Sequence, residues 1–236
     1  MPDRKDPTAN PSKSVEDFIK AVYGLQQQDE RVSTNALSAA LNISAPSVTD
    51  MAQRLVTAGL VDYERYKGVV LTSAGREMAL KVIRRHRLIE LYLVRELGYE
   101  LREVHIEAEQ LEHAVSDHFV EAVARKLGNP DFDPHGDPIP AADGTVMQRQ
   151  LMRLSELPEN VNALVSQLKT SSPEMLQHIL DRGFKLDSQV EVVARDPFEG
   201  PITTRVDGHE RMVGHNVAEC ILVDANAGEV EKSGSQ

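Results

Sequence analysis

The chain has 236 residues, of which 41% are hydrophobic and 27% are charged, as in folded proteins that bury a core of their own. Its 26 Lys and Arg residues against 37 Asp and Glu residues give a net charge of −11, which argues against general polyanion binding but leaves room for a local nucleic-acid surface. The sequence has no run of about 18 apolar residues and a polar N-terminus, so we expect neither a membrane-spanning helix nor a secretory signal. The one cysteine, Cys220, excludes an internal disulfide, and we expect it in the core of a cytoplasmic protein.

The N-terminal third predicts a winged helix-turn-helix. Apolar residues recur at helical spacing over 14–25 and 34–41, and a third helix is expected from Pro46 to just before Gly59. The following segment, LVDYERYKGVVLT, alternates apolar and polar residues around a Lys-Gly turn and predicts a β-hairpin. Helix, turn, helix and hairpin in this order are typical of DNA-binding domains.

The third helix of this group is the expected reading element. With Val48, Met51 and Leu55 facing the core, it presents short or planar hydrogen-bonding side chains outward, as a helix in the major groove does. The predicted DNA contacts are Ser44, Pro46, Ser47, Thr49, Asp50, Gln53 and Arg54 around this helix, and Arg65 and Lys67 on the hairpin. The carboxylate of Asp50 also fits a winged helix that binds another protein.

Longer helical patterns follow. Apolar residues recur at helical spacing over 73–97 and over 103–127, and each pattern predicts one helix of about 37 Å. Helices of this length exceed what the first domain can cover, which suggests a dimerisation surface. The stretch 128–146 is rich in Pro, Gly and Asp and predicts a loop, and shorter helices are expected at 147–154 and 173–182. Four strand patterns near the C-terminus, VEVVAR, ITTRV, ERMVG and ECILVD, suggest a small β-barrel.

The two long helical patterns carry histidines and carboxylates at spacings that share a helix face. His86 and Glu90 are four residues apart. The second pattern has four such residues at i, i+4, i+7 and i+8, namely His105, Glu109, Glu112 and His113. Carboxylates this close repel one another unless a cation or proton lies among them, so the pattern predicts a divalent metal ion.

Simpler interpretations exist for some of these residues. Glu90 and Glu112 also fit helix-surface ion pairs with arginines, and Asp17 fits the capping box SVED at a helix start. His118 and His135 are expected at a surface and in a loop, respectively.

Three stretches together resemble the diphtheria toxin repressor and manganese transport regulator family. They are SVEDFIKAVYGL, then SAPSVTDMAQRLVTAGLV with the hairpin YERYKGVVLT, and then RRHRLIELYLVRELGYELREVHIEAEQLEHAVSD with PHGDPIP. The resemblance covers residues 12–224. It implies a mainly α protein with an N-terminal winged helix-turn-helix, a helical dimerisation and metal-binding domain, and a small C-terminal SH3-like β-barrel. It also implies a metal-dependent transcriptional regulator, expected to be a repressor of metal-transport genes.

The expected domain boundaries follow from the resemblance and the patterns together. They are a disordered tail at 1–13, the DNA-binding domain at 14–76, the helical domain at 77–150, a linker with short helices at 151–185, the SH3-like domain at 186–224 and a second disordered tail at 225–236.

Carried over by position, the resemblance implies two metal sites. The primary ligands are Asp17, Glu109, Glu112 and His113, and the ancillary ligands are His86, Glu90 and His105. Iron-type members carry Met and Cys where this chain has Asp17 and Glu109, and hard oxygen donors suit Mn²⁺ better than sulfur does. We therefore expect Mn²⁺ as the metal, with Fe²⁺ as second choice and other divalent transition metals binding in vitro.

Two positions depart from the family pattern. Lys20 stands where short manganese regulators have a second acidic residue, which favours a separate ancillary site over a paired two-metal site. Three-domain members also draw ancillary ligands from near the third domain. There this chain has Ser172 and Met175, with Glu174 and His178 as substitutes.

The resemblance implies that the metal acts as a clip. An ion held by Asp17 of the DNA-binding domain and by ligands of the dimerisation domain would set the recognition helices of a homodimer about 34 Å apart on palindromic operator DNA. Neither a membrane nor a small-molecule substrate is an expected partner. A di-metal carboxylate enzyme would show Glu-x-x-His signatures that this chain lacks, and a metal-independent winged-helix interaction module would leave the His and Glu residues unexplained.

Overall fold

The computed structural model describes residues 12–27 and 29–227 and divides into two compact units. The first unit holds the described residues up to His86 together with 110–122 and 140–146, and the second holds 87–109, 123–139 and the described residues from Met147 onward. Most of the two predicted tails lies outside the described residues.

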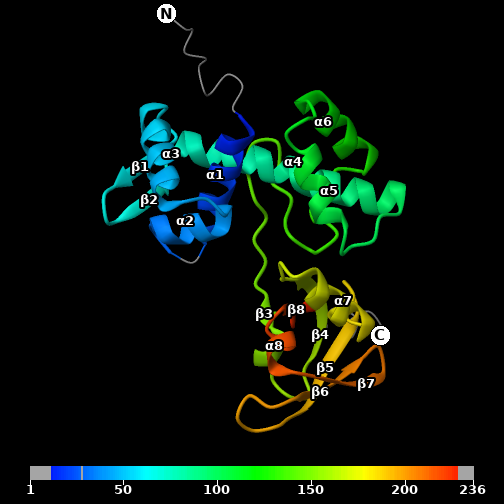
Figure 1. The fold of residues 1–236 in the computed structure, drawn as a ribbon. Coiled ribbons are helices and arrows are strands. Elements are labelled where there is room, and N and C mark those ends of the chain that lie inside the picture. The colour runs from blue at the N-terminus through cyan, green and yellow to red at the C-terminus, as the bar shows by residue number, and fades with distance from the viewer. Residues whose placement is uncertain (1–11, 28, 228–236) are drawn as a thin grey trace, which may run out of the picture. The chain divides into compact units, whose positions relative to one another are not determined.

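The first unit contains the predicted helix-turn-helix and its hairpin (Figure 1). The elements are α1 (Lys13–Leu25), α2 (Thr34–Leu41), α3 (Ala45–Thr57), β1 (Val61–Glu64) and β2 (Gly68–Leu71), and the two strands are antiparallel. Hydroxyl caps set two of the helix starts, because Ser33 Oγ accepts from the Ala36 N–H at 3.1 Å and Ser44 Oγ accepts from the Ser47 N–H at 3.3 Å. The three predicted helices and the hairpin are confirmed.

The first helix begins one residue before its expected start. Ser12 is the N-cap of α1, and its carbonyl oxygen accepts from the N–H groups of Val15 and Glu16 at 2.8 and 3.1 Å. Because Ser14 then lies inside the helix, the capping box SVED does not form. The carboxylate of Asp17 is therefore not used as a helix cap.

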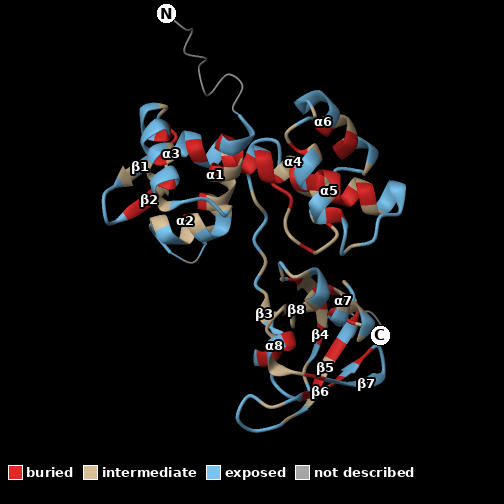
Figure 2. Ribbon diagram, viewed as in Figure 1, coloured by how far each residue is buried: buried red, intermediate tan, exposed pale blue. Residues whose placement is uncertain are grey.

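One hydrophobic core joins these elements within the first unit (Figure 2). Its fully buried members include Phe18 of α1, Leu37 of α2 and Leu55 of α3. The following helix packs closely on this core through Gly75, where a Cβ would lie 1.9 Å from the carbonyl oxygen of Leu60. Only glycine fits this approach without a shift of backbone.

The predicted long helix over 73–97 is confirmed, but the one over 103–127 is wrong. The former is α4 (Ser73–Leu97), whereas the latter is two helices, α5 (Val104–Leu111) and α6 (Asp117–Lys126). The Ser116 hydroxyl accepts from the Phe119 N–H at 3.2 Å and so starts a new helix. Apolar periodicity continues across this break and conceals it. As a consequence, Glu112 and His113 lie in a turn and not on a helix.

The second unit contains a six-stranded antiparallel sheet. Its strands are β3 (Met152–Arg153), β4 (Asn162–Leu168), β5 (Gln189–Arg195), β6 (Ile202–Val206), β7 (His209–Val213) and β8 (Ile221–Asp224), in the order β3-β8-β4-β5-β6-β7. The shorter helical elements are η1 (Leu154–Glu156), α7 (Pro173–Asp181) and α8 (His215–Ala218). Leu154, Val165 and Phe184 are fully buried in its core.

The sequence patterns predicted β5, β6, β7, β8 and α7, but they did not predict β3 or β4. The helix expected at 147–154 is wrong, because the chain there is irregular and then forms β3 and the start of η1. The strand β4 falls within the stretch expected to be a linker with short helices. Cys220 packs half-buried against the core, but it lies in the turn before β8 and not in the strand expected over ECILVD. No described helix is both long and apolar enough to cross a bilayer.

Candidate metal centre

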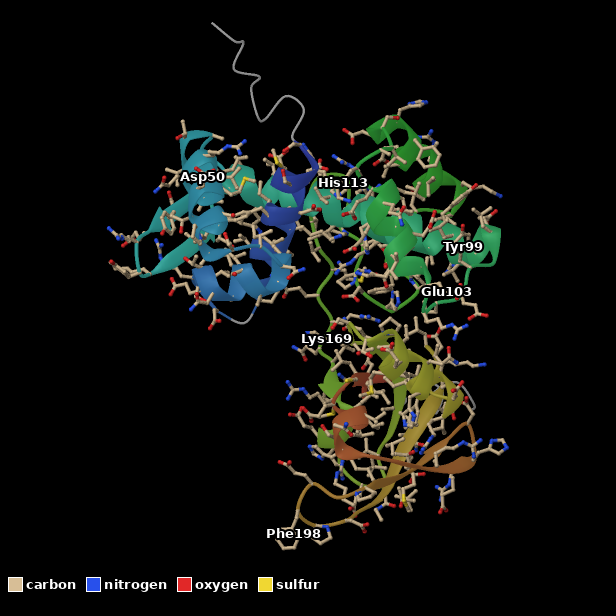
Figure 3. The ribbon with its side chains drawn as sticks, in the orientation of Figure 1. Asp50, Tyr99, Glu103, His113, Lys169 and Phe198 are labelled. Carbon is tan, nitrogen blue, oxygen red and sulfur yellow. The ribbon has the colours of Figure 1, made fainter. Side chains whose placement is uncertain are left out.

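Three predicted primary ligands meet in the first unit. Asp17 comes from α1, and Glu112 and His113 come from the turn after α5; one ligand atom from each lies within 4.8 Å of the others. His113 Nε2 is 2.9 Å from Asp17 Oδ1 and 3.3 Å from Glu112 Oε1. The Glu112 side chain is 1% exposed and that of Asp17 is 36% exposed, so the group opens toward solvent on the Asp17 side. We call these three residues the primary cluster; His113 is labelled in Figure 3.

A buried carboxylate that sequence analysis missed orients the histidine. Glu16 Oε2 lies 2.6 Å from His113 Nδ1, and Glu16 Oε1 accepts a hydrogen bond from Arg85 Nη1 at 3.0 Å. Glu16 itself is 4% exposed. A carboxylate that holds the far nitrogen of a ligand histidine fixes both its ring orientation and its tautomer. The available signal was a charged residue beside Asp17 at a core-facing position of α1.

The geometry around His113 calls for a cation. In the tautomer with its proton on Nδ1 facing Glu16, His113 directs the lone pair of Nε2 toward two carboxylate oxygens. Among the described residues, Nε2 is a buried polar atom that forms no hydrogen bond of acceptable geometry. A metal ion or a second proton would relieve the repulsion between these atoms. Two carboxylates and one imidazole, without sulfur, form a hard donor set that fits a divalent cation such as Mn²⁺.

Glu112 has further partners besides His113. Lys20 Nζ donates to Glu112 Oε1 at 2.9 Å and to Oε2 at 3.0 Å, and His86 Nδ1 lies 2.6 Å from Oε2. Burial raises the pKa of Glu112, but the hydrogen bond with His86 and the charge of Lys20 outweigh it and hold that pKa below the ordinary value. Glu112 is therefore ionised at neutral pH and is shared between the primary cluster and Lys20.

The fourth predicted primary ligand is assigned to the other unit. Glu109 belongs to the second unit, its side chain is 53% exposed, and Oε1 lies 3.4 Å from His105 Nε2. The expected single helix face through His105, Glu109, Glu112 and His113 is wrong, because α5 ends at Leu111. Of the predicted ancillary ligands, His86 is the last residue of the first unit, whereas Glu90 and His105 belong to the second.

The second unit has a carboxylate and histidine group of its own. Ligand atoms of Glu90, Asp133 and His135 lie within 4.8 Å of one another, and we call these residues the second cluster. Glu90 Oε1 is 3.1 Å from His105 Nδ1, and Glu90 Oε2 is 3.7 Å from His135 Nδ1. His135 does lie in a loop, as expected, but only 13% of its side chain is exposed. Sequence analysis missed Asp133 and His135 as site residues; the spacing Asp-x-His was the available signal.

Electrostatics in the second cluster favour protonation. Burial, together with the charges of Asp137 and Glu90, raises the pKa of Asp133 to about 7. Burial lowers the pKa of His135, but the hydrogen bond with Glu90 and the nearby carboxylates outweigh it and raise that pKa overall. Asp133 and His135 thus hold protons more readily than usual, and a bound cation would displace them.

The predicted DNA-reading residues are all at least partly exposed on the first unit. Those around the start and outer side of α3 are exposed: Ser44, Pro46, Ser47, Asp50, Gln53 and Arg54. Figure 3 labels Asp50 on this helix. Thr49 is half-buried, and its Oγ1 donates to the Ala45 carbonyl oxygen at 3.1 Å; its contact with DNA stays a prediction.

On the hairpin, Arg65 and Lys67 flank an exposed aromatic residue that sequence analysis missed. Tyr66 is 92% exposed and has a left-handed backbone, with φ of 68°. The Arg65 guanidinium lies 5.0 Å from the Tyr66 ring centroid, and Lys67 Nζ is 2.7 Å from Glu64. A cation and an aromatic side chain are thus presented together at the tip of the wing.

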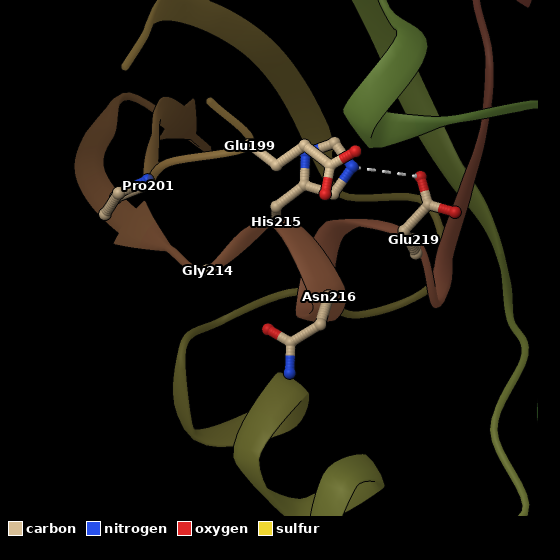
Figure 4. Close-up of a pocket in the computed structure, with 6 residues that line it drawn as sticks. All are labelled: Glu199, Pro201, Gly214, His215, Asn216 and Glu219. Atoms are coloured by element: carbon tan, nitrogen blue, oxygen red, sulfur yellow. Dashed lines mark ion pairs between the residues drawn. The ribbon is translucent and has the colours of Figure 1, made fainter. Parts of the chain in front are cut away.

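Two hollows lie on the second unit away from the second cluster. One, of about 570 Å³, is lined by Glu199, Pro201, Gly214, His215, Asn216 and Glu219 (Figure 4). The other, of about 400 Å³, is lined by Arg102, Pro173, Glu174, Gln177, His178 and Asp181. Among the residues that the structure describes, neither hollow provides three His, Cys, Asp or Glu ligand atoms in mutual reach. Glu174 and His178 therefore gain no support as metal ligands.

Family models match the chain in three consecutive segments. Residues 11–69 match the iron dependent repressor N-terminal DNA binding domain, 72–141 match the iron dependent repressor metal binding and dimerisation domain, and 152–225 match the FeoA domain. These matches confirm the expected order of a winged helix-turn-helix, a helical dimerisation part and an SH3-like β domain.

Known proteins match over most of their length. The iron-dependent repressor IdeR of Mycobacterium leprae is 28% identical over 89% of this chain and 96% of its own length. MntR of Oceanobacillus iheyensis is 34% identical over 45% of this chain and 71% of its own length. A solved manganese-dependent transcriptional repressor in complex with manganese is 39% identical, covers 89% of this chain and 98% of its own, and superposes with a TM-score of 0.81. The chain therefore belongs to the diphtheria toxin repressor and manganese transport regulator family of metal-dependent transcriptional repressors.

Proposed function

We propose that this chain is a manganese-activated repressor that binds palindromic operator DNA as a homodimer and has no catalytic reaction of its own. The observation that carries the proposal is the buried Nε2 of His113, which faces oxygens of Asp17 and Glu112 while Glu16 holds the opposite ring nitrogen. With neither a second proton on the ring nor a cation present, this arrangement is repulsive, and a bound cation makes it favourable.

The donor set supports manganese over iron. The primary cluster offers two carboxylates and an imidazole, and hard oxygen donors suit Mn²⁺. The match to a manganese-dependent repressor at 39% identity points the same way. Fe²⁺ accepts the same donors, so a direct comparison of the two metals is part of the test. We retain Glu109 as a predicted primary ligand.

A bound ion would connect metal sensing to DNA reading through α1. Asp17 lies on α1, which packs on α2, and α2 packs on the reading helix α3. Glu112 and His113 lie 95 and 96 positions later in the chain, in the turn after α5. An ion held by all three would fix α1 against that turn and so favour one placement of α3. Since the metal favours the DNA-binding state, DNA should tighten metal binding in return.

A second cation would bind in the second unit. Glu90, Asp133 and His135 are its proposed ligands, with His105 in contact with Glu90. His86 remains a predicted ancillary ligand. This position would stabilise the loop that carries Asp133 and His135.

The test is a mobility shift on DNA from upstream of the protein's own gene and of neighbouring metal-transport genes. Metal-free protein would be compared with protein given Mn²⁺, or Fe²⁺ without oxygen, with EDTA as the reversal. We expect a shift with Mn²⁺ that EDTA abolishes and that His113→Ala abolishes too. His118→Ala is the matched control, because His118 is exposed on α6. DNA binding that persists in EDTA, or a His113→Ala variant that still responds to Mn²⁺, would refute the proposal.

A further inference from the structure

Lys20 occupies an unusual position beside the primary cluster. Its ammonium group donates to both oxygens of Glu112, at 2.9 and 3.0 Å, and lies 3.2 Å from His86 Nδ1. The Glu112 carboxylate is almost fully buried, at 1% exposure, and the Lys20 side chain is 23% exposed. A buried carboxylate needs partners, and here they are the Lys20 ammonium and the His86 ring, not solvent.

The Lys20 ammonium changes the net charge around the primary cluster. Glu16 pairs with Arg85, which also lies 3.4 Å from the exposed Asp117, and these three groups are left out of the count. Before any charge on His86 or His113 is counted, Asp17 and Glu112 bring two negative charges to the cluster and Lys20 brings one positive charge, which gives a net charge of −1. A divalent ion would bring this to +1, whereas without the Lys20 charge the same ion would bring it to zero.

The Lys20 ammonium and a metal ion in the primary cluster would also share one oxygen atom. Glu112 Oε1 accepts from Lys20 and is the oxygen that lies 3.3 Å from His113 Nε2. A metal ion bound to the primary cluster would therefore draw on an oxygen that already carries a strong hydrogen bond. It would also lie close to an ammonium of like charge, and such repulsion is large at short range away from bulk water.

We propose that Lys20 is an internal competitor for the metal ion, which weakens the affinity of the primary cluster and so sets the metal concentration at which the protein responds. In the metal-free protein, Lys20 neutralises Glu112 and keeps the site assembled. With the metal present, it limits how tightly the ion is held. This inference rests on the proposed function, because it assumes that the ion binds Asp17, Glu112 and His113.

The experiment is Mn²⁺ titration, followed by the electron paramagnetic resonance signal of free Mn²⁺, on the full chain. Lys20→Gln and Lys20→Met remove the charge with different side-chain chemistry, and Lys20→Arg retains it. Lys13→Gln is the matched control, because Lys13 is exposed on the same helix. We expect the dissociation constant to fall at least tenfold in Lys20→Gln and Lys20→Met, and to change less than threefold in Lys20→Arg and Lys13→Gln.

Thermal unfolding of the same variants separates competition from a structural role. In EDTA, Lys20→Gln and Lys20→Met should melt at a lower temperature than the wild type, because Glu112 is buried without its ammonium partner. Added Mn²⁺ should then raise the melting temperature of these variants by more than it raises that of the wild type. An unchanged or weaker Mn²⁺ affinity in both uncharged variants, together with a lower melting temperature, would show that Lys20 only stabilises the fold and would overturn the inference. If His113→Ala instead binds Mn²⁺ as tightly as the wild type, the proposed function is overturned.

Discussion

Replacing Glu16 by glutamine should weaken metal binding although Glu16 is not itself a proposed ligand. The substitution keeps the size of the side chain but removes the charge that lies 2.6 Å from His113 Nδ1 and 3.0 Å from Arg85 Nη1. Hydrogen bonds to charged groups contribute about 1.5–3 kcal/mol each. Loss of a carboxylate that orients a ligand histidine commonly lowers metal affinity by about 10–100-fold. We expect a loss of Mn²⁺ affinity within that range.

Isothermal titration of the metal-free variant with Mn²⁺ measures this effect directly. Glu77→Gln is the control, since Glu77 is an exposed residue of α4 paired with Lys81. A lower unfolding midpoint is also expected for Glu16→Gln, because Arg85 loses its buried partner. If Glu16→Gln is less stable in EDTA yet binds Mn²⁺ within twofold of the wild type, Glu16 supports the fold and does not orient His113, and the argument from its contact with Nδ1 fails.

Three further predictions concern other parts of the chain. Gly75→Ala should destabilise the protein by about 1–3 kcal/mol in urea unfolding, because the new Cβ would lie 1.9 Å from the Leu60 carbonyl oxygen. The control Gly24→Ala should be neutral or stabilising, because no atom lies within 4 Å of its new Cβ. Equal effects of the two substitutions would contradict the packing argument. Tyr66→Gly should stabilise the fold, because glycine adopts the left-handed backbone of this position without strain. It should also weaken operator binding, because the exposed ring is lost, and unchanged operator affinity would exclude a DNA contact by Tyr66. Burial and nearby carboxylates raise the pKa of Asp133 from its ordinary value of 3.8 to about 7. The protonated Asp133 carboxyl therefore contributes fully to the free energy of unfolding below about pH 4, and this contribution is lost as the pH rises through 7. In EDTA, Asp133→Asn should flatten this part of the stability profile, and parallel profiles for variant and wild type would show that Asp133 does not titrate there.

Local pattern alone was sufficient for the elements that position the primary cluster. The helical spacing in α1, α2, α3 and α4 and the alternation in the hairpin predicted these elements within a residue or two, because a single core-facing side decides each of them. The same pattern was misleading over 103–127, where apolar spacing continues through a turn. A serine cap, whose effect depends on one hydrogen bond, ends that regularity.

Sequence by itself identified Asp17, Glu112 and His113 as ligand candidates, from residue type, spacing and family resemblance, but it did not identify the residues that control them. Glu16 meets His113 across 97 positions of the chain, and Lys20 meets Glu112 across 92. No spacing rule relates residues so far apart, because their approach depends on how α1 packs against α4 and the turn after α5. Residue chemistry thus determined which groups can hold a metal ion, and only tertiary packing decided which buried charges accompany them.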